Sequence, residues 1–331
     1  MSGPILVLVE LGSGDAAGVA DRVSLETLAF ARSVADGLGG APIEAVLFGP
    51  DASSAAAGLG AHGVVTAHVI TDPAITGAYA PAAWGAALAE LAGARGAVAV
   101  IGPGTDHGAE VVAHSASRLA MPLAANVLAA TPGASWTVTR QRWAGSLLED
   151  AALDAPVRCL TMAPHAVAVD ERAGSPAAAV APFAPIVLAE DLAVRVTGHE
   201  PPSKGSISLT DAKVVVGGGR GVGSSAAFSE LEELAELLGA AIGVSRVVTS
   251  NGWRPHTQQV GQTGQRIAPD LYIACGISGA IQHIVGCKSA KRILAINTDA
   301  ESPIMALADY AVIGDLHQVV PAISAEIRRR A

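Results

Sequence analysis

The sequence predicts an α/β fold with two domains, each built on a mainly parallel, doubly wound sheet. Short runs of Val, Ile, Leu and Ala alternate with helical stretches, as expected for strands that helices cover on both faces. The chain has 331 residues, which is enough for two cores of ordinary size. Stretches rich in Pro, Gly and Ala interrupt the alternation at 174–185 and 198–205. We place the boundary in the second stretch, which gives domains 1–200 and 201–331.

The elements of the N-terminal domain follow from this alternation. We expect buried strands at 5–9, 43–48 and 97–101 and helices at 24–38, 81–94 and 108–120. Ser24 is expected to cap the first helix, with Glu26 in its first turn. Further on, 135–142 alternates like an exposed antiparallel strand, and 157–162 has the composition of a strand that returns to the sheet.

A second α/β unit is expected to start near residue 213. Its strands are predicted at 213–216, 241–244, 271–274, 292–296 and 311–313, with helices at 226–238 and from about 318 onward. Five strands in this order form a doubly wound domain. In such a domain ligands bind at the carboxyl ends of the strands.

The composition argues against several classes of protein. Hydrophobic residues make up 50% of the chain and charged residues 15%, so extensive disorder is excluded. With 3% aromatic residues and a net charge of −9, we expect no nucleic-acid partner. The apolar run at 4–9 is too short to span a bilayer and no basic segment precedes it, so we expect a cytoplasmic protein that is not itself a membrane protein. The three cysteines show no metal-binding spacing and are expected to be buried thiols.

The first candidate site is the glycine-rich turn at 217–224, between a predicted strand and a predicted helix. Glycines let backbone N–H groups approach a phosphate closely, and a helix N-terminus favours negative charge. The strict G-x-G-x-x-G pattern is not met, because Ser224 stands where the third glycine belongs. A phosphate-bearing ligand and a plain tight turn therefore both remain open for this segment.

A second turn of the same kind lies at 276–283. Ser278 is expected to cap the helix while its first amides face an anion, with His283 in the next turn. Between the two turns, the polar loop at 260–265 offers amide and hydroxyl groups to a planar heterocycle, although a surface turn would look the same. A lone histidine is more often a structural residue. Two glycine-rich strand-to-helix turns in one small domain nevertheless favour a dinucleotide.

Taken together, these segments resemble the alpha-subunit family of electron-transfer flavoproteins. The matching motifs lie between 214 and 321 and include Gly-Gly-Arg-Gly at 218–221, Ser-Arg at 245–246, Val-Gly-Gln-Thr-Gly at 260–264, Leu-Tyr-Ile-Ala-Cys-Gly-Ile-Ser-Gly-Ala-Ile-Gln-His at 271–283, Ala-Ile-Asn at 295–297 and Gly-Asp-Leu at 314–316. The N-terminal domain is similar in general layout only. The resemblance implies a Rossmann-like FAD-binding domain at 201–331 and a dimer-forming domain with a nucleotide-binding-like fold at 1–200.

The resemblance also implies contacts to FAD, residue by residue. The pyrophosphate and ribityl region would be held by Arg220, Ser278, Gly279, Ala280, Ile281 and Gln282. The isoalloxazine ring would lie against Ser245, Arg246, Gly261, Gln262, Thr263, Gly264 and His283, with Gln262 and Thr263 at its N5/O4 edge and His283 at the pyrimidine carbonyl. The adenosine end would contact Asn297, Asp315 and Leu316, while Arg220 could also reach the adenosine side. No catalytic residue and no metal ligand are expected.

The implied function is that of an electron carrier and not of an enzyme with its own organic substrate. The chain would pair with a beta subunit as a heterodimer and accept electrons from flavin dehydrogenases, such as the acyl-CoA dehydrogenases of fatty acid beta-oxidation. It would pass them to a quinone reductase or another acceptor, with a hinge at 198–205. Thr298 and Gln265 stand where the family usually has Lys, which leaves the flavin potentials and the docking of partners open.

Two other interpretations remain at this point. In an NADP-binding oxidoreductase domain, Arg246 at the end of the second strand would bind a 2′-phosphate. In the N-terminal domain, the Gly-Pro-Gly-Thr segment at 102–105 could accept a phosphate, although we favour a structural role for that domain in the dimer interface. Electron bifurcation, with a second flavin in the beta subunit, is neither indicated nor excluded.

Overall fold

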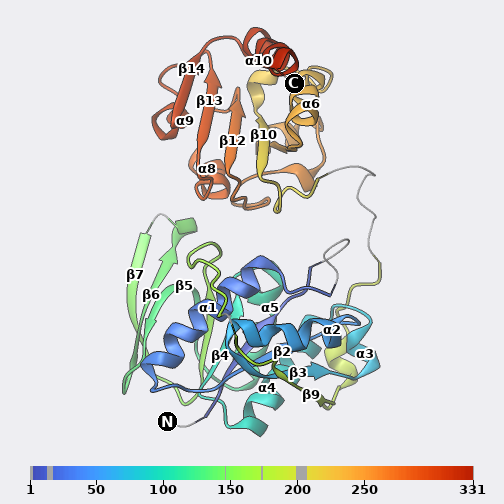
Figure 1. The fold of residues 1–331 in the computed structure, drawn as a ribbon, viewed down its shortest axis with the longest axis vertical. Helices are drawn as coiled ribbons and strands as arrows, with labels where there is room; N and C mark the ends of the chain where they lie inside the picture. Colours follow the sequence, from blue (N-terminus) through green and yellow to red (C-terminus); the bar gives the residue numbers. More distant parts are fainter. Residues whose placement is uncertain (1–2, 13–17, 146, 173, 199–206, 331) are drawn as a thin grey trace. The chain divides into compact units, whose positions relative to one another are not determined.

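A computed structural model of the chain describes residues 3–12, 18–145, 147–172, 174–198 and 207–330. The chain divides into two compact units, Met1–His199 and Glu200–Ala331. Each unit has its own sheet with helices packed on it (Figure 1). The predicted linker and hinge at 198–205 lies outside the described residues except for Gly198.

The N-terminal unit is built on one large sheet. Among the described residues it has nine strands in the order β7-β6-β5-β8-β4-β1-β2-β3-β9. Their bounds are β1 Ile5–Val9, β2 Ile43–Leu47, β3 Val64–Ile70, β4 Ala99–Pro103, β5 Leu123–Thr131, β6 Trp136–Arg142, β7 Leu147–Leu153, β8 Arg158–Met162 and β9 Ala179–Phe183. Neighbouring strands are parallel, apart from the antiparallel pairs β5–β6 and β6–β7. The exposed antiparallel strand and the returning strand expected from the sequence are therefore confirmed.

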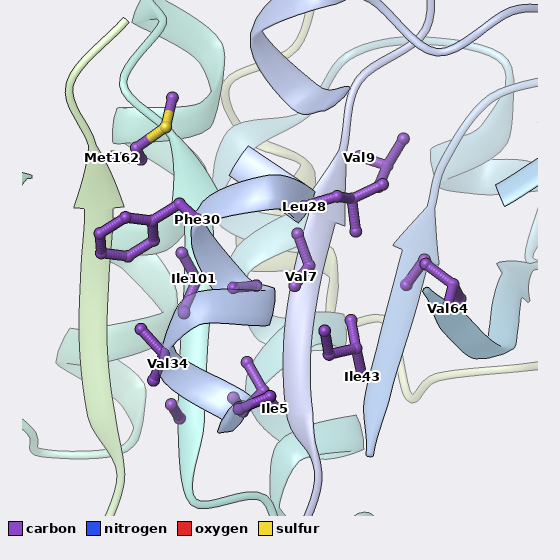
Figure 2. Close-up of a cluster of buried hydrophobic side chains, with 14 of the residues drawn as sticks. Ile5, Val7, Val9, Leu28, Phe30, Val34, Ile43, Val64, Ile101 and Met162 are labelled. Atoms are coloured by element: carbon purple, nitrogen blue, oxygen red, sulfur yellow. The ribbon is translucent and has the colours of Figure 1, made fainter. Parts of the chain in front are cut away.

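Helices cover both faces of this sheet. On one face, Ile5 and Val7 of β1 pack against Leu28, Phe30 and Val34 of α1 (Arg22–Gly37), as Figure 2 shows. The alternate β1 residues Leu6 and Leu8 face the other core, which α4 (Pro81–Arg95) and α5 (Asp106–Arg118) close. The short helices α2 (Ala52–Ala56) and α3 (Pro73–Thr76) follow β2 and β3. Burial on both faces explains why these strands are continuously apolar.

Two local predictions in this unit are wrong. The cap of α1 is Asp21 and not Ser24: the Asp21 carboxylate accepts a hydrogen bond from the Ser24 N–H (2.6 Å), and the helix starts at Arg22. The Ser24 hydroxyl instead accepts one from the backbone N–H of Glu10 (2.8 Å). The stretch 174–185, read as an interruption, contains β9, which pairs with β3 at the edge of the sheet. Pro182 is tolerated there because an edge strand has one unpaired side.

The C-terminal unit has a smaller, wholly parallel sheet with the strand order β11-β10-β12-β13-β14 among the described residues. The strands are β10 Val214–Gly218, β11 Ala241–Val244, β12 Leu271–Cys275, β13 Ile293–Asn297 and β14 Tyr310–Ile313. The helices are α6 Phe228–Leu238, α7 Arg246–Ser250, α8 Ile281–Cys287, α9 Pro303–Leu307 and α10 Leu316–Arg330. All five predicted strands are present within two residues of their expected bounds.

Two separate cores flank this sheet. One lies between the sheet and the helices α6 and α10, which pack on the same face (Figure 1). The other is closed by residues of α8 and α9, including Cys287 and Ile304. The predicted fold class is thus confirmed for both units: α/β with mainly parallel, doubly wound sheets. The three cysteines, Cys159, Cys275 and Cys287, are buried free thiols, as expected.

The order of each sheet reverses at one point. The connection from β10 leads outward to β11, while β12 lies on the other side of β10; likewise β1 leads to β2, while β4 lies on the other side of β1. In doubly wound sheets ligands bind at the carboxyl ends of the strands beside such a reversal. We therefore expect a ligand site at the turns after β10 and β12 or at the turns after β1 and β4.

Candidate functional site

The turns after β10 and β12 touch each other through their backbones. The N–H of Gly219 donates to the Cys275 carbonyl oxygen (2.9 Å), and the N–H of Gly221 donates to the Gly276 carbonyl oxygen (3.0 Å). A Cβ atom on Gly219 would collide with that Gly276 oxygen, and Gly276 itself has a positive φ of 60°. Only glycine permits both features. Part of the glycine pattern read as a phosphate-binding turn therefore serves the close packing of two turns.

The first glycine of the pattern makes room for a side chain. A Cβ on Gly217 would collide with the hydroxyl of Tyr272, which lies fully buried on the neighbouring strand β12. That hydroxyl is 2.8 Å from Nε2 of His283 in α8. Tyr272 belongs to the motif that indicates the family, but the sequence reasoning assigned it no role. A tyrosine within an otherwise apolar strand was the available signal.

His283 is buried, with 6% of its surface exposed. Because burial disfavours the charged ring, the pKa of His283 falls from 6.5 to about 4, and the imidazole is neutral near pH 7. The ring can therefore act only as a neutral hydrogen-bonding group. Its predicted contact with a flavin carbonyl remains a prediction.

The loop at 260–264 lies between the end of β11 and α8. Its Val260 N–H donates to the Val244 carbonyl (2.9 Å), and its Gln262 N–H donates to the Gln282 carbonyl (2.7 Å). Gly261 has a φ of 144°, and a Cβ there would press on the Gln282 carbonyl. The side chains of Gln262 and Thr263 are exposed. The structure thus brings this loop beside the second glycine-rich turn, as the proposed flavin contacts require.

The start of α8 differs from the prediction. The helix begins at Ile281 with Ala280 at the N-cap position and no side-chain cap, so Ser278 does not cap it. Ser278 lies two residues before the N-cap position. Within the described chain, no hydrogen bond uses the backbone N–H groups of Ser278, Gly279 or Ala280. Three free donors in succession can bind an anionic oxygen.

Two exposed arginines flank the same edge of the sheet. Arg220 follows β10, and Arg246 opens α7 directly after β11. Across the residues that the structure describes, neither guanidinium takes part in an ion pair. Both positive charges are therefore available to an anionic ligand, and a guanidinium binds phosphate with paired hydrogen bonds.

The three residues assigned to the adenosine end are held in different ways. Asn297 ends β13, and its side-chain amide donates to the Ile277 carbonyl (2.9 Å) and accepts from the Asp299 N–H (3.0 Å). The Asp315 carboxylate is exposed and accepts from the His317 N–H (3.0 Å). Leu316 is buried in the core under α10. The side chains of Asn297 and Leu316 are thus used within the protein, and of the three assigned residues only Asp315 is exposed.

The groups collected at this edge suit a dinucleotide with a planar ring. The N–H groups of 278–280 and the guanidinium of Arg220, which have no partner within the described residues, are of the kind that binds a pyrophosphate. The exposed amide and hydroxyl of Gln262 and Thr263 match the polar edge of a heterocycle. For the described residues, no cluster of His, Cys, Asp and Glu is suited to a metal ion, and no helix is both long and apolar enough to cross a membrane.

Comparisons with known proteins identify the family of this chain. The electron transfer flavoprotein domain family matches residues 6–187, and the electron transfer flavoprotein FAD-binding domain family matches residues 208–288. The alpha subunit of an electron transfer flavoprotein from Bacillus subtilis is 32% identical over 333 residues, covering 99% of this chain and 98% of that protein. The one from Thermoanaerobacterium thermosaccharolyticum is also 32% identical, over 93% of this chain and 94% of its own length.

A shorter stretch is more similar still. The Paracoccus denitrificans alpha subunit is 54% identical over 119 residues, which is 36% of this chain and 39% of that protein. The chain belongs to the alpha-subunit family of electron-transfer flavoproteins, and its cofactor is FAD, bound by the C-terminal unit.

Proposed function

We propose that this protein is the FAD-carrying half of a heterodimer with a beta subunit, and that it shuttles electrons in the cytoplasm. Its donors would be flavin dehydrogenases, such as the acyl-CoA dehydrogenases of fatty acid beta-oxidation. Its acceptor would be a quinone reductase or another redox protein. The observation that supports this proposal most strongly lies at the carboxyl end of the C-terminal sheet. There the glycine turns touch, and within the described part of the chain three neighbouring backbone N–H groups have no hydrogen bond and two guanidiniums have no ion pair.

The residues of this chain would divide the work by chemistry. Bound FAD supplies one-electron and two-electron redox chemistry. Arg220 and the N–H groups of residues 278–280 would neutralise the pyrophosphate. Arg246 would lie against the isoalloxazine and stabilise the negative charge that reduction adds, since a nearby cation lowers the energy of added charge. Ser245, the loop at 261–264 and His283 would position the ring, while Ile281 and Gln282 would help to hold the pyrophosphate and ribityl region.

An NADP-binding domain is disfavoured as the alternative. Arg246 does follow the second strand of the sheet, where a 2′-phosphate would be bound. The family match over 208–288, however, is to an FAD-binding domain. We therefore keep the FAD assignment for Arg246 and test it directly.

The test uses the chain co-expressed with its beta subunit, and compares Arg246→Gln with Arg246→Lys. Loss of a charged hydrogen-bonding partner typically costs about 1.5–3 kcal/mol, which corresponds to roughly ten- to hundredfold weaker FAD binding. We expect Arg246→Gln to show this loss together with a lower flavin midpoint potential, and Arg246→Lys to retain part of both. Arg292→Gln is the matched control, because Arg292 is exposed beside the opposite end of the same sheet and pairs with Asp309 (2.7 Å).

The outcomes separate the interpretations. A yellow complex with visible flavin bands, weakened only by the changes at Arg246, supports the proposal. A colourless complex that does not take up added FAD would overturn it. Equal effects of the Arg246 and Arg292 changes would show that Arg246 acts only through general charge, and the assigned contact would have to be withdrawn.

A further inference from the structure

A buried glutamine connects two hydroxyl groups behind the loop at 260–264. Gln259 has 2% of its surface exposed. Its Oε1 lies 2.6 Å from the hydroxyl of Thr249 in α7, and its Nε2 lies 3.0 Å from the hydroxyl of Thr263. Thr263 is exposed, so the chain of hydrogen bonds runs from the interior to the surface of the proposed flavin site.

The direction of these bonds follows from their chemistry. The Thr249 hydroxyl has two acceptors within reach, Gln259 Oε1 (2.6 Å) and the Arg246 carbonyl oxygen (2.9 Å). Its one proton goes to the nearer glutamine oxygen, and the glutamine nitrogen donates to the Thr263 hydroxyl (3.0 Å). A hydroxyl has one proton and two lone pairs. Because Thr263 accepts from Gln259, its own proton is free for a partner on the exposed side.

The backbone of the loop leaves few other groups for a ligand. The N–H groups of Gly261 and Gly264 donate to carbonyls within the loop (both 3.1 Å), and that of Gln265 donates to the Gln259 carbonyl (2.6 Å). The Gln262 N–H is bound to the Gln282 carbonyl (2.7 Å). No hydrogen bond among the described residues uses the Thr263 N–H, so this N–H, the Thr263 hydroxyl and the Gln262 side-chain amide are the polar groups of the loop left for a ligand.

We propose that Gln259 is a positioning residue that holds the Thr263 hydroxyl as a hydrogen-bond donor toward the redox-active edge of the bound flavin. The proposal rests on the function proposed above, in which Thr263 faces the ring. Reduction adds electron density to the ring, so a fixed donor there binds reduced FAD more tightly than oxidised FAD. Gln259 contributes to this preference without touching the cofactor.

The test is a double-mutant cycle on the heterodimer with Gln259→Met and Thr263→Val. The readouts are the flavin midpoint potential and the dissociation constant of oxidised FAD, which together give the ratio of the affinities for reduced and oxidised FAD. Since one hydrogen bond contributes about 1 kcal/mol, we expect each single change to lower this ratio roughly fivefold. The double variant should be no worse than Thr263→Val, because Gln259 acts only through that hydroxyl.

Gln258→Met is the matched control. Gln258 precedes Gln259 in the chain, and its buried Oε1 has no hydrogen-bond partner among the described residues. The same substitution there should leave the ratio unchanged. If Gln259→Met does not fold, Thr249→Val replaces it, with Thr249→Ser as the variant that keeps the hydroxyl and should behave as the natural chain.

Failure of the inference is distinguishable from failure of the proposed function. If Thr263→Val leaves the ratio unchanged, Thr263 does not face the ring, and both the assigned contact and the inference are overturned. If Thr263→Val lowers the ratio but Gln259→Met and Thr249→Val do not, only the inference is overturned. Additive effects in the double variant would show that Gln259 is merely structural.

Discussion

Each unit of this chain has one reversal in its strand order, but the groups beside the two reversals are opposite in charge. In the C-terminal unit the glycines beside the reversal touch, and the neighbouring N–H groups of 278–280 and guanidiniums of Arg220 and Arg246 have no partner among the residues that the structure describes. In the N-terminal unit, Glu10 follows β1 and Thr105 follows β4, and the Thr105 hydroxyl donates to both carboxylate oxygens of Glu10 (2.8 and 3.0 Å). The same hydroxyl accepts from the Gly108 N–H (2.9 Å). A phosphate at 102–105 would meet the Thr105 hydroxyl, which is already hydrogen-bonded, and the acidic side chains of Glu10 and Asp21.

The acidic groups beside this reversal have raised pKa values. Burial, together with the charge of Asp21, raises the pKa of Glu10 from 4.5 to about 7, and burial raises the pKa of Asp21 as well. Two acidic groups beside this reversal disfavour an anionic ligand there. The fold therefore decides which strand ends can form a binding site, while the residues at those ends decide whether an anionic cofactor can bind there.

The largest expected effect comes from closing the glycine contact with Gly219→Ala. The added Cβ meets the Gly276 carbonyl oxygen, so the two turns must separate. We expect a loss of stability of about 1–3 kcal/mol or more, and a heterodimer that purifies without flavin. Absorbance at the flavin bands and urea unfolding measure the two effects.

Gly93→Ala in α4 is the control, because a Cβ at Gly93 meets open space. There we expect stability to rise by up to about 1 kcal/mol, because alanine favours a helix. If the Gly219→Ala protein retains both its stability and its flavin, the close approach of the two turns is dispensable. The contrast between the two units would then not depend on this glycine contact.

The next largest effect concerns the acidic group Glu10, which follows β1 in the N-terminal unit. Between pH 4.5 and 7 the folded chain keeps a proton on Glu10 that the unfolded chain has released, so this group lowers stability as the pH rises through that range. Glu10→Gln removes the titration and still accepts from Thr105. At pH 8 we expect it to raise the free energy of unfolding by about 2–3 kcal/mol, and at pH 4 to change it little.

Thermal unfolding of the natural and Glu10→Gln chains at the two pH values measures this difference. A stability gain of the same size at pH 4 and pH 8 would contradict the raised pKa. If the Glu10→Gln chain binds adenine nucleotide or phosphate, charge alone keeps anions away from the ends of β1 and β4.

The smallest effect is expected from Tyr272→Phe in the C-terminal unit. The change removes the hydroxyl that bonds to His283 and leaves a buried ring nitrogen without its partner. We expect a loss of about 1–2 kcal/mol, compared with almost none for Tyr310→Phe, where the side chain is exposed. Chemical denaturation of both variants is the measurement, and equal losses would show that the buried bond contributes nothing.

His283 also gives this unit a pH dependence opposite to that of Glu10. Its pKa is about 4 in the folded chain and 6.5 when unfolded, so between these values the unfolded chain binds a proton that the folded chain does not. Its contribution to stability is present above pH 6.5 and is lost as the pH falls toward 4.

The sequence predicted the strands of the C-terminal sheet more accurately than it predicted the helix caps. The five strands of the C-terminal sheet were placed within two residues, because continuous apolar runs bounded by glycine have few other solutions. The caps were less certain: Ser24 and Ser278 are suitable capping residues by type, but neither caps a helix. The Ser24 hydroxyl instead accepts from the N–H of Glu10, 14 residues away in the chain. β9 was missed because its composition resembles a loop, and its partner β3 lies more than 100 residues earlier.

Local patterns in the chain were enough for the two α/β units, the buried thiols and the family with its FAD cofactor, because periodicity and short motifs are local properties. Only the tertiary structure decided what each polar or small residue does. It shows Gly217 making room for Tyr272 and Gly219 lying against Gly276, both across more than 50 residues of chain. It also shows that the side chains of Thr105 and Gln259 make hydrogen bonds to other groups of the protein. Such contacts depend on which strands become neighbours, and the order of residues along the chain does not display that.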